Sequence, residues 1–411
     1  MSEVLTAPRV ITGDETVTDG AVVIGDAVVH WAGPAQALPT EYLGLPRTDY
    51  PGSTIMPGLI DSHVHLGFDG GRKPVARMRA ETDEQQLVLM LHSARELLGV
   101  GVTTARDLGA RAYLAVVVRD AIAAGLARGP RMVVAASPIT ITGGHCWFMG
   151  GEADNADDLR RMVRTHHKHG TDLIKVMSTG GFMTTGSAPW YAQFTSAQLA
   201  VIVEEAGRVG KPVAAHAHGI EGIRRAVEAG VTTIEHCSFG TETNEQRFSE
   251  SLTARMAEQG TFVCPTINVN APHFTELTGI VVGAHVKAMH EMGVRIIAGT
   301  DAGIHKTPHH QYVGGLEYFV TLGFQPAEVL AMATTEAAAA LGLGATTGRL
   351  APGYDADLIV VEGDPRMDIA VLGQLRRVIA RGRDYVPDSG RFDVSAPGTP
   401  FASPQHAVDR R

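Results

Sequence analysis

The sequence has few cysteines, few aromatic residues and no excess of basic charge. Three of its 411 residues are cysteine, too few for a disulfide framework, which indicates a reducing compartment. Lys and Arg number 35 against 44 Asp and Glu, and no basic run occurs, so charge-driven binding to nucleic acid is not expected. Because there is neither a run of about 18 apolar residues nor a leader-like start, we expect a cytoplasmic protein without a membrane partner.

Histidine and apolar residues are abundant instead. There are 18 histidines, and several stand in close pairs beside Gly, Asp or Thr. Hydrophobic residues make up 44% of the chain and charged residues 19%, so a large core is possible and extensive disorder is excluded. The length predicts two to four domains, or one large α/β barrel with an attachment.

The two ends of the chain resemble each other and differ from the middle. Residues 1–55 contain short apolar segments separated by Gly, Asp and Pro, a pattern typical of β-hairpins. Similar segments return in residues 349–390, so we expect one small β unit drawn from both ends. Residues 391–411 are expected to form an extended tail because Pro, Ser and Gly are frequent there.

Residues 56–348 alternate short apolar segments with amphipathic ones. Eight segments are expected as strands: 59–63, 102–107, 132–136, 172–177, 213–216, 233–236, 262–265 and 295–301. In the clearest helix, Thr195 and Gln198 form a capping box and Gly210 stands at the expected end. Eight strand–helix units favour a (β/α)8 TIM barrel, although the alternation by itself also fits an open, doubly wound sheet.

Residues suited to metal binding fall at or near the C-terminal ends of these expected strands. His63 and His65 are alternate residues of the first strand, so both rings can reach the same face. The other candidates belong to strands four, five, six and eight: Lys175, His216, His236 and Asp301. Active sites of TIM barrels lie at this end of the strands, and four imidazoles with a carboxylate suit Zn²⁺ or a similar divalent ion. The sequence therefore predicts a metal site.

Lys175 fits such a site only under one of three interpretations. An ammonium facing metal cations is destabilised both by desolvation and by repulsion. Lys175 is therefore a salt-bridged core lysine, or it points outward, or its Nζ carries a carbamate that turns a cation into a bridging carboxylate. The residues alone leave all three open.

Several motifs together resemble a known family. They are MPGLIDSHVH at 56–65, Lys175, AHAHG at 215–219, IEHC at 234–237 and GTDAG at 299–303. With this set the chain resembles the amidohydrolase superfamily over nearly its whole length, and within it the imidazolonepropionase-like and prolidase-like branch. The resemblance implies a TIM barrel over 56–348. The segment GRLAPGYDADLIVV at 348–361 is similar to the returning strands of that superfamily's small β-sandwich, here 1–55 plus 349–390.

The resemblance also implies a binuclear site with two divalent ions, Zn²⁺ by expectation. Its implied ligands are His63, His65 and Asp301 for the more buried ion, His216 and His236 for the more exposed ion, and a carbamylated Lys175 with a hydroxide as bridges. Asp301 would accept the proton of the attacking hydroxide and deliver it to the departing amine. We interpret His145, which follows strand three, as a hydrogen-bond donor to the substrate carbonyl oxygen, the alternative being a loop-packing histidine.

The substrate pocket is less sharply indicated. The candidate substrate residues are His218, Trp147, Trp190, Asn268 and His305. Aromatic residues gather after strands three and four, which indicates either a partly apolar pocket or anchoring of the loops. Peptidase-like relatives often carry a Tyr after strand seven, whereas this chain has PTINVN at 265–270, which argues against dipeptidase-like carboxylate recognition.

We therefore predict a metal-dependent enzyme, expected as a homo-oligomer, that hydrolyses the amide C–N bond of a small acyl-amino acid, dipeptide or aryl amide. The first alternative is cleavage of a carbamate, urea or ester, or opening of a cyclic amide, in a xenobiotic. A deaminase is a second alternative, against which Lys175 argues. A non-catalytic scaffold is a third, against which the complete set of ligand positions argues.

Overall fold

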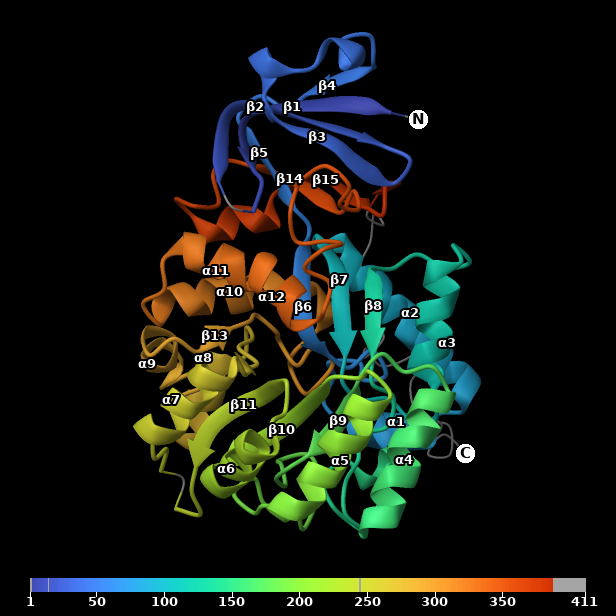
Figure 1. Cartoon of the computed structure of the whole chain (residues 1–411), viewed down its shortest axis with the longest axis vertical. Coiled ribbons are helices and arrows are strands. Elements are labelled where there is room, and N and C mark those ends of the chain that lie inside the picture. Colours follow the sequence, from blue (N-terminus) through green and yellow to red (C-terminus); the bar gives the residue numbers. More distant parts are fainter. Residues whose placement is uncertain (1, 14, 244, 387–411) are drawn as a thin grey trace, which may run out of the picture.

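A computed structural model describes residues 2–13, 15–243 and 245–386, and shows a small β domain above a larger α/β domain (Figure 1). The tail expected over 391–411 lies outside the described residues. Within the described ranges, no helix has both the length and the apolar character needed to cross a membrane. Both ends of the described chain contribute to the β domain.

The β domain is one sheet in the order β16-β15-β14-β5-β1-β2-β3, with β4 paired to β1. Its strands are β1 (Glu3–Ile11), β2 (Thr16–Gly25), β3 (Val28–Pro34), β4 (Arg47–Asp49), β5 (Ser53–Pro57), β14 (Leu358–Glu362), β15 (Leu375–Ala380) and β16 (Arg383–Tyr385). Side chains of β14 point alternately to its two faces, so this strand contributes to the cores of both domains. Leu358 and Val360 pack inside the β domain, whereas Ile359 and Val361 pack against the larger domain.

The larger domain is a (β/α)8 barrel. Its strands are β6 (Leu59–Val64), β7 (Val102–Asp107), β8 (Arg131–Val134), β9 (Ile174–Met177), β10 (Val213–Gly219), β11 (Thr233–Gly240), β12 (Phe262–Cys264) and β13 (Arg295–Ile296). They pair in parallel as β6-β7-β8 and β9-β10-β11-β12-β13. Backbone hydrogen bonds join the two sheets on both sides, from Ile139 N to Lys175 O (2.8 Å) and from Asp301 N to His63 O (2.8 Å).

Three strand ends differ from the sequence prediction by three residues or more. β10 and β11 continue to Gly219 and Gly240, so His216 and His236 lie within their strands. β13 ends at Ile296, because the following residues bond individually to neighbouring segments, as when Ser62 N donates to Ala298 O. This irregular stretch leads into Asp301.

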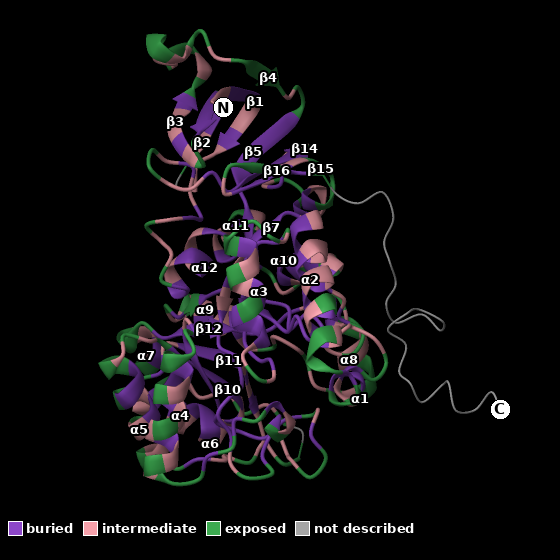
Figure 2. Cartoon of the chain, turned by 90° about the vertical axis from the view of Figure 1, so that its right-hand side faces the viewer, coloured by how far each residue is buried: buried purple, intermediate pink, exposed green. Residues whose placement is uncertain are grey.

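Helices cover the outside of the barrel, with buried inner faces and exposed outer faces (Figure 2). They are α1 (Pro74–Ala80), α2 (Asp83–Gly99), α3 (Leu114–Ala123), α4 (Ala156–Lys168), α5 (Ser196–Arg208), α6 (Ile220–Ala229), α7 (Glu250–Gln259), α8 (Ala271–Thr278), α9 (Val286–Glu291), α10 (Tyr312–Thr321), α11 (Pro326–Met332) and α12 (Thr335–Ala340). Single 3-10 turns are η1 (Ala35–Ala37), η2 (Thr40–Tyr42), η3 (Trp147–Met149), η4 (His309–Gln311) and η5 (Ile369–Gly373). The capping box of Thr195 and Gln198 at the start of α5 is confirmed.

Charged contacts also join the two domains. Arg131 of β8 forms ion pairs with Asp355 and with Asp357, the latter at 3.1 Å, in the segment that leads into β14. Asp357 is fully buried and also accepts hydrogen bonds from Thr347 Oγ1 and Arg381 N. A buried carboxylate with three donors holds the returning chain against the barrel.

Candidate metal centre

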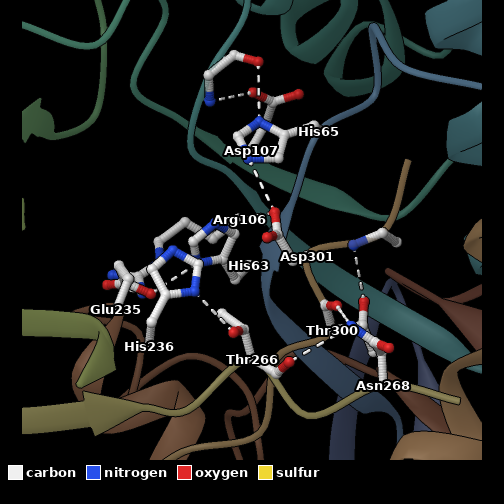
Figure 3. Close-up of polar contacts among 12 residues, drawn as sticks. His63, His65, Arg106, Asp107, Glu235, His236, Thr266, Asn268, Thr300 and Asp301 are labelled. Atoms are coloured by element: carbon white, nitrogen blue, oxygen red, sulfur yellow. Dashed lines mark hydrogen bonds and ion pairs between the residues drawn. The ribbon is translucent and has the colours of Figure 1, made fainter. Parts of the chain in front are cut away.

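Three of the predicted ligands meet at the C-terminal end of β6. Asp301 Oδ1 lies 3.4 Å from His63 Nε2 and 3.1 Å from His65 Nε2 (Figure 3). All three side chains are buried or nearly so. Asp301 has a left-handed backbone (φ 61°), a conformation that costs energy in a residue with a Cβ and that occurs where surrounding structure enforces it.

A second group of imidazoles lies beside the first. The ring centroids of His216 and His236 are 4.5 Å apart, and the ring of His218 stacks on that of His236 at 4.3 Å. His236 also approaches His63, with 5.4 Å between ring centroids, so the two groups are continuous. Nitrogens of His216, His218 and His236 come within 4.8 Å of one another, as do ligand atoms of His63, His236 and Asp301.

Each of the four predicted imidazole ligands has one nitrogen committed as a donor. Nδ1 of His65 bonds to Gly109 O (3.1 Å), and Nδ1 of His236 bonds to Thr266 Oγ1 (2.8 Å), whose own proton goes to a backbone carbonyl. Nδ1 of His63 donates to a carboxylate, and Nε2 of His216 donates to a backbone carbonyl. In the neutral form of each ring, the other nitrogen therefore keeps its lone pair for a cation.

The protonation states also suit cation binding. Burial lowers the pKa of His63 to about 4 and holds the pKa values of His216 and His236 well below their usual range. Burial opposes ionisation of Asp301, but its contacts with His63 and His65 outweigh that effect and hold the pKa of this carboxyl below its usual range. The same contact with Asp301 outweighs burial at His65 and raises the pKa of that ring. Neutral His63, His216 and His236 beside an ionised carboxylate are donors that a divalent metal requires, and His65 would join them by releasing its Nε2 proton when a cation binds.

Lys175 lies on β9, facing the same cavity, with only 1% of its surface exposed. Among the described residues its Nζ has no hydrogen-bond partner. Burial lowers its pKa to about 8, and its charge in turn lowers the pKa values of His63 and His216, which belong to the two different groups. The structure thus places Lys175 inside the site and leaves its amine without the salt bridge that a core lysine requires.

A buried ion pair supports His63 from behind, and the sequence did not reveal it. Glu235 Oε2 accepts from His63 Nδ1 (2.8 Å), and Glu235 Oε1 accepts from Arg106 Nη2 (3.0 Å; Figure 3). Burial opposes ionisation of Glu235, but the charge of Arg106 and the hydrogen bond from His63 hold its pKa below the usual range. Strict alternation would send Glu235 and His236 to opposite faces, but the left-handed backbone at His236 (φ 68°) lets both reach His63.

His145 follows β8 and lies over the second group of imidazoles. Its ring centroid is 4.7 Å from that of His216, and only 2% of the residue is exposed. Burial lowers its pKa to about 3, so the ring is neutral. A Cβ built on Gly181 would lie 2.4 Å from His145 Nε2, so glycine at this position leaves room for the ring.

A cavity of about 650 Å³ opens above the six predicted metal ligands, and they all contribute to its lining. Among the residues predicted to contact substrate, His218, Trp190, Asn268 and His305 also line it. Trp147 does not; it is 38% exposed and packs under Arg79. The Asn268 amide group is already engaged by backbone atoms, since it donates to Thr300 O (2.9 Å), beside Asp301, and accepts from Asn270 N (3.0 Å) of its own loop.

Comparison with known families gives a match to the amidohydrolase family over residues 54–384. The chain belongs to this family. It is an enzyme that hydrolyses C–N bonds, and its fold is a TIM barrel. The family is generally metal-dependent, in agreement with the candidate metal-binding groups of the structure.

Individual relatives of this amidohydrolase include ochratoxinase of Aspergillus niger, 29% identical over 91% of this chain and 84% of the relative. The crystal structure of that ochratoxinase superposes with a TM-score of 0.82, at 27% identity, over 98% of this chain and 99% of the other. Imidazolonepropionase of a Ruegeria species is 28% identical over 84% and 87% of the two chains. A structure of a Xaa-Pro dipeptidase with methionine bound in its active site gives a TM-score of 0.84, at 29% identity, over 94% and 100% of the two chains.

Proposed function

We propose that this amidohydrolase uses two divalent metal ions, Zn²⁺ by preference, to hydrolyse the amide C–N bond of a small acyl-amino acid, dipeptide or aryl amide. The observation that carries the proposal is the buried amine of Lys175, which has no partner among the described residues and influences both groups of ligands. A carbamate on Nζ removes the uncompensated cation and supplies two oxygens for ligation. With a pKa of about 8, a useful fraction of this amine is neutral and able to add to carbon dioxide.

The residues that would hold the first ion are His63, His65 and Asp301, and those that would hold the second are His216 and His236, with the Lys175 carbamate shared between them. When bound, the two ions supply Lewis acidity and lower the pKa of water enough to provide a nucleophile near neutral pH. We divide the ligands in this way because the donor atoms form two groups that share His236, one with His216 and the other with His63 and Asp301.

Two side chains are proposed to act on the substrate and on protons. Asp301 is ionised and faces the cavity, so it can accept a proton from attacking water and deliver it to the departing amine nitrogen. Neutral His145 faces the cavity and can donate an N–H to the carbonyl oxygen as negative charge develops there. The His145 Nδ1 atom has no partner among the described residues, so no protein group ties the ring to one tautomer, and Nε2 is able to carry the proton that such a donor requires.

The substrate class is inferred from the cavity and from the relatives. Phe182, Trp190 and Phe274 give the cavity apolar walls that suit an aryl or aliphatic acyl group. The relatives include an ochratoxinase and a Xaa-Pro dipeptidase, and a dipeptidase acts on a linear amide, which supports linear amides as the first choice. A second candidate is opening of a cyclic amide, which the imidazolonepropionase relatives favour.

Metal analysis tests the centre independently of substrate. We expect about two metals per chain in protein produced with zinc and bicarbonate, and fewer in Lys175→Ala, by plasma mass spectrometry. The matched control is Lys168→Ala, which removes an exposed amine from α4 and should leave the metal content unchanged. One metal in both wild type and Lys175→Ala would contradict the carbamate-bridged centre. A panel of acyl-amino acids, dipeptides, anilides and cyclic amides then assigns the bond that is cleaved.

A further inference from the structure

Three cations at the rim of the cavity have no anionic partner among the described residues. Arg72 and Lys73 precede α1, and Arg79 lies within it; all three are exposed and line the cavity. The neighbouring Arg77 provides the contrast, because it is buried and pairs with Asp69 (2.9 Å) and Glu81 (2.6 Å). Acidic side chains are therefore available in this segment, yet they neutralise only the inward-facing arginine.

The rest of the lining offers these cations no counter-charge. Asp301 is the one carboxylate among the described lining residues, and it belongs to the metal centre. The chain as a whole carries a formal charge of −9, so a cavity rim with three cations runs against its overall charge. Such a local reversal raises the concentration of anionic ligands at the site.

Backbone bonds hold the start of this segment beside the loop that follows Asp301. Gly70 N donates to Gly303 O (2.8 Å), and Lys306 N donates to Gly70 O (3.0 Å). His305 Nδ1 donates to Gly71 O (3.1 Å). Arg72 thus follows directly after a stretch that is bonded to the catalytic loop, so the cations have a defined position relative to the reacting centre.

We propose that Arg72, Lys73 and Arg79 form a carboxylate-binding subsite, and that the preferred substrates are amides carrying a free carboxylate together with an apolar group. The apolar group would pack on Phe182 and Phe274, whose rings meet edge to face at 5.7 Å on the cavity wall. This inference rests on the proposed amide hydrolysis and specifies its substrate class. Residues 265–270 lack the tyrosine that peptidase-like relatives often carry after strand seven. Under this proposal, the cations of the α1 segment bind the substrate carboxylate instead.

The direct test measures binding of non-hydrolysable probes. The carboxylate probe is 3-phenylpropionate and the neutral probe is 3-phenyl-1-propanol, each titrated calorimetrically into the metal-loaded enzyme. We expect the triple variant Arg72→Gln/Lys73→Gln/Arg79→Gln to bind the carboxylate about tenfold more weakly and the alcohol equally well, taking a modest contribution from each exposed ion pair. The matched control Arg128→Gln removes an exposed arginine that does not line the cavity, and should leave both affinities unchanged.

Salt and fold controls sharpen the binding result. Raising the ionic strength should weaken 3-phenylpropionate binding to the wild type more than to the triple variant, because exposed charges are screened. The replaced side chains are exposed, so the triple variant should unfold at the wild-type temperature. Equal affinity of wild type and folded triple variant for 3-phenylpropionate would overturn the subsite, even if the metal ions also contact the probe.

Kinetics separate failure of this inference from failure of the proposed function. With N-benzoyl-L-phenylalanine and its neutral carboxamide as substrates, the triple variant should lose kcat/KM for the carboxylate alone. Turnover of both compounds with identical losses would leave amide hydrolysis standing and overturn the subsite. If no amide is turned over but the triple variant still loses 3-phenylpropionate binding selectively, the proposed amide hydrolysis is wrong and the anion subsite is supported.

Discussion

Replacing Glu235 by Gln should weaken metal binding without removing any metal ligand. Glu235 accepts the Nδ1 proton of His63, which orients the ring and directs its Nε2 lone pair toward Asp301. Gln keeps the size and one acceptor oxygen but loses the charge that makes the imidazole a stronger donor. Loss of a partner of this kind costs about 10–100-fold in metal affinity, or roughly 1.4–2.7 kcal/mol.

The same substitution leaves a buried cation uncompensated. Arg106 keeps its bond to Ser62 O (2.7 Å), but its only ion-pair partner among the described residues is Glu235. Such an orphaned charge destabilises a fold by about 3–5 kcal/mol. A second variant, Arg106→Met with Glu235→Leu, should recover most of this stability because it removes the buried cation as well. It should still bind metal weakly, because His63 still lacks its carboxylate partner.

The assay is competition for zinc between the folded protein and a chromophoric chelator, with unfolding followed separately by heating. Glu205→Gln is the matched control, since Glu205 is also a buried carboxylate paired with an arginine (Arg164, 2.7 Å) but lies on α5, away from the cavity. Zinc affinity of Glu235→Gln equal to that of Glu205→Gln, while His63→Ala has lost zinc, would refute the supporting role of Glu235.

Three further outcomes are expected. At a fixed concentration of dissolved carbon dioxide, bicarbonate-dependent metal loading should rise with pH through about 8 and level off above it, because only the neutral form of Lys175 reacts; loading independent of pH would contradict this. Gly181→Ala should lower kcat by about 10–100-fold at unchanged metal content, since the new methyl group displaces His145; unchanged kcat would remove His145 from the reaction. Arg131→Ala should lower the free energy of unfolding in urea by about 2 kcal/mol, because Asp357 stays buried without its cation, and an unchanged value would show that its other two donors suffice.

The parts of the structure that sequence predicts are those with a local or periodic signal. The eight barrel strands follow from apolar segments at regular intervals, and the start of α5 follows from the capping box. The clustering of His63, His216 and Asp301 follows from the rule that strand ends of a barrel meet at one face. These predictions need no knowledge of side-chain packing.

The features that sequence did not predict depend on an irregular backbone or on a charged side chain without an oppositely charged neighbour. Glu235 was missed because alternation assigns it to the face opposite His236, and one positive φ overrides that rule. Arg72 and Arg79 belong to no sequence motif, because exposed cations are common. They become notable only in the structure, where Asp301 is the one carboxylate among the described residues that line the cavity. Trp147 shows the converse, because this aromatic residue is close in sequence to His145, which lines the cavity, yet it packs outside the cavity itself.

The pairing of β5 with β14 has a consequence for synthesis of the protein. These strands are neighbours in the sheet but stand about 300 residues apart in the chain, with the whole barrel between them. At cellular translation rates of about 5–20 residues per second, β5 therefore waits roughly 15–60 s for its partner to leave the ribosome. Throughout that interval a strand whose five residues are all buried in the finished protein presents an edge of unpaired backbone groups. Chaperone demand during translation should therefore be greatest in this window, and it should end when β14 arrives.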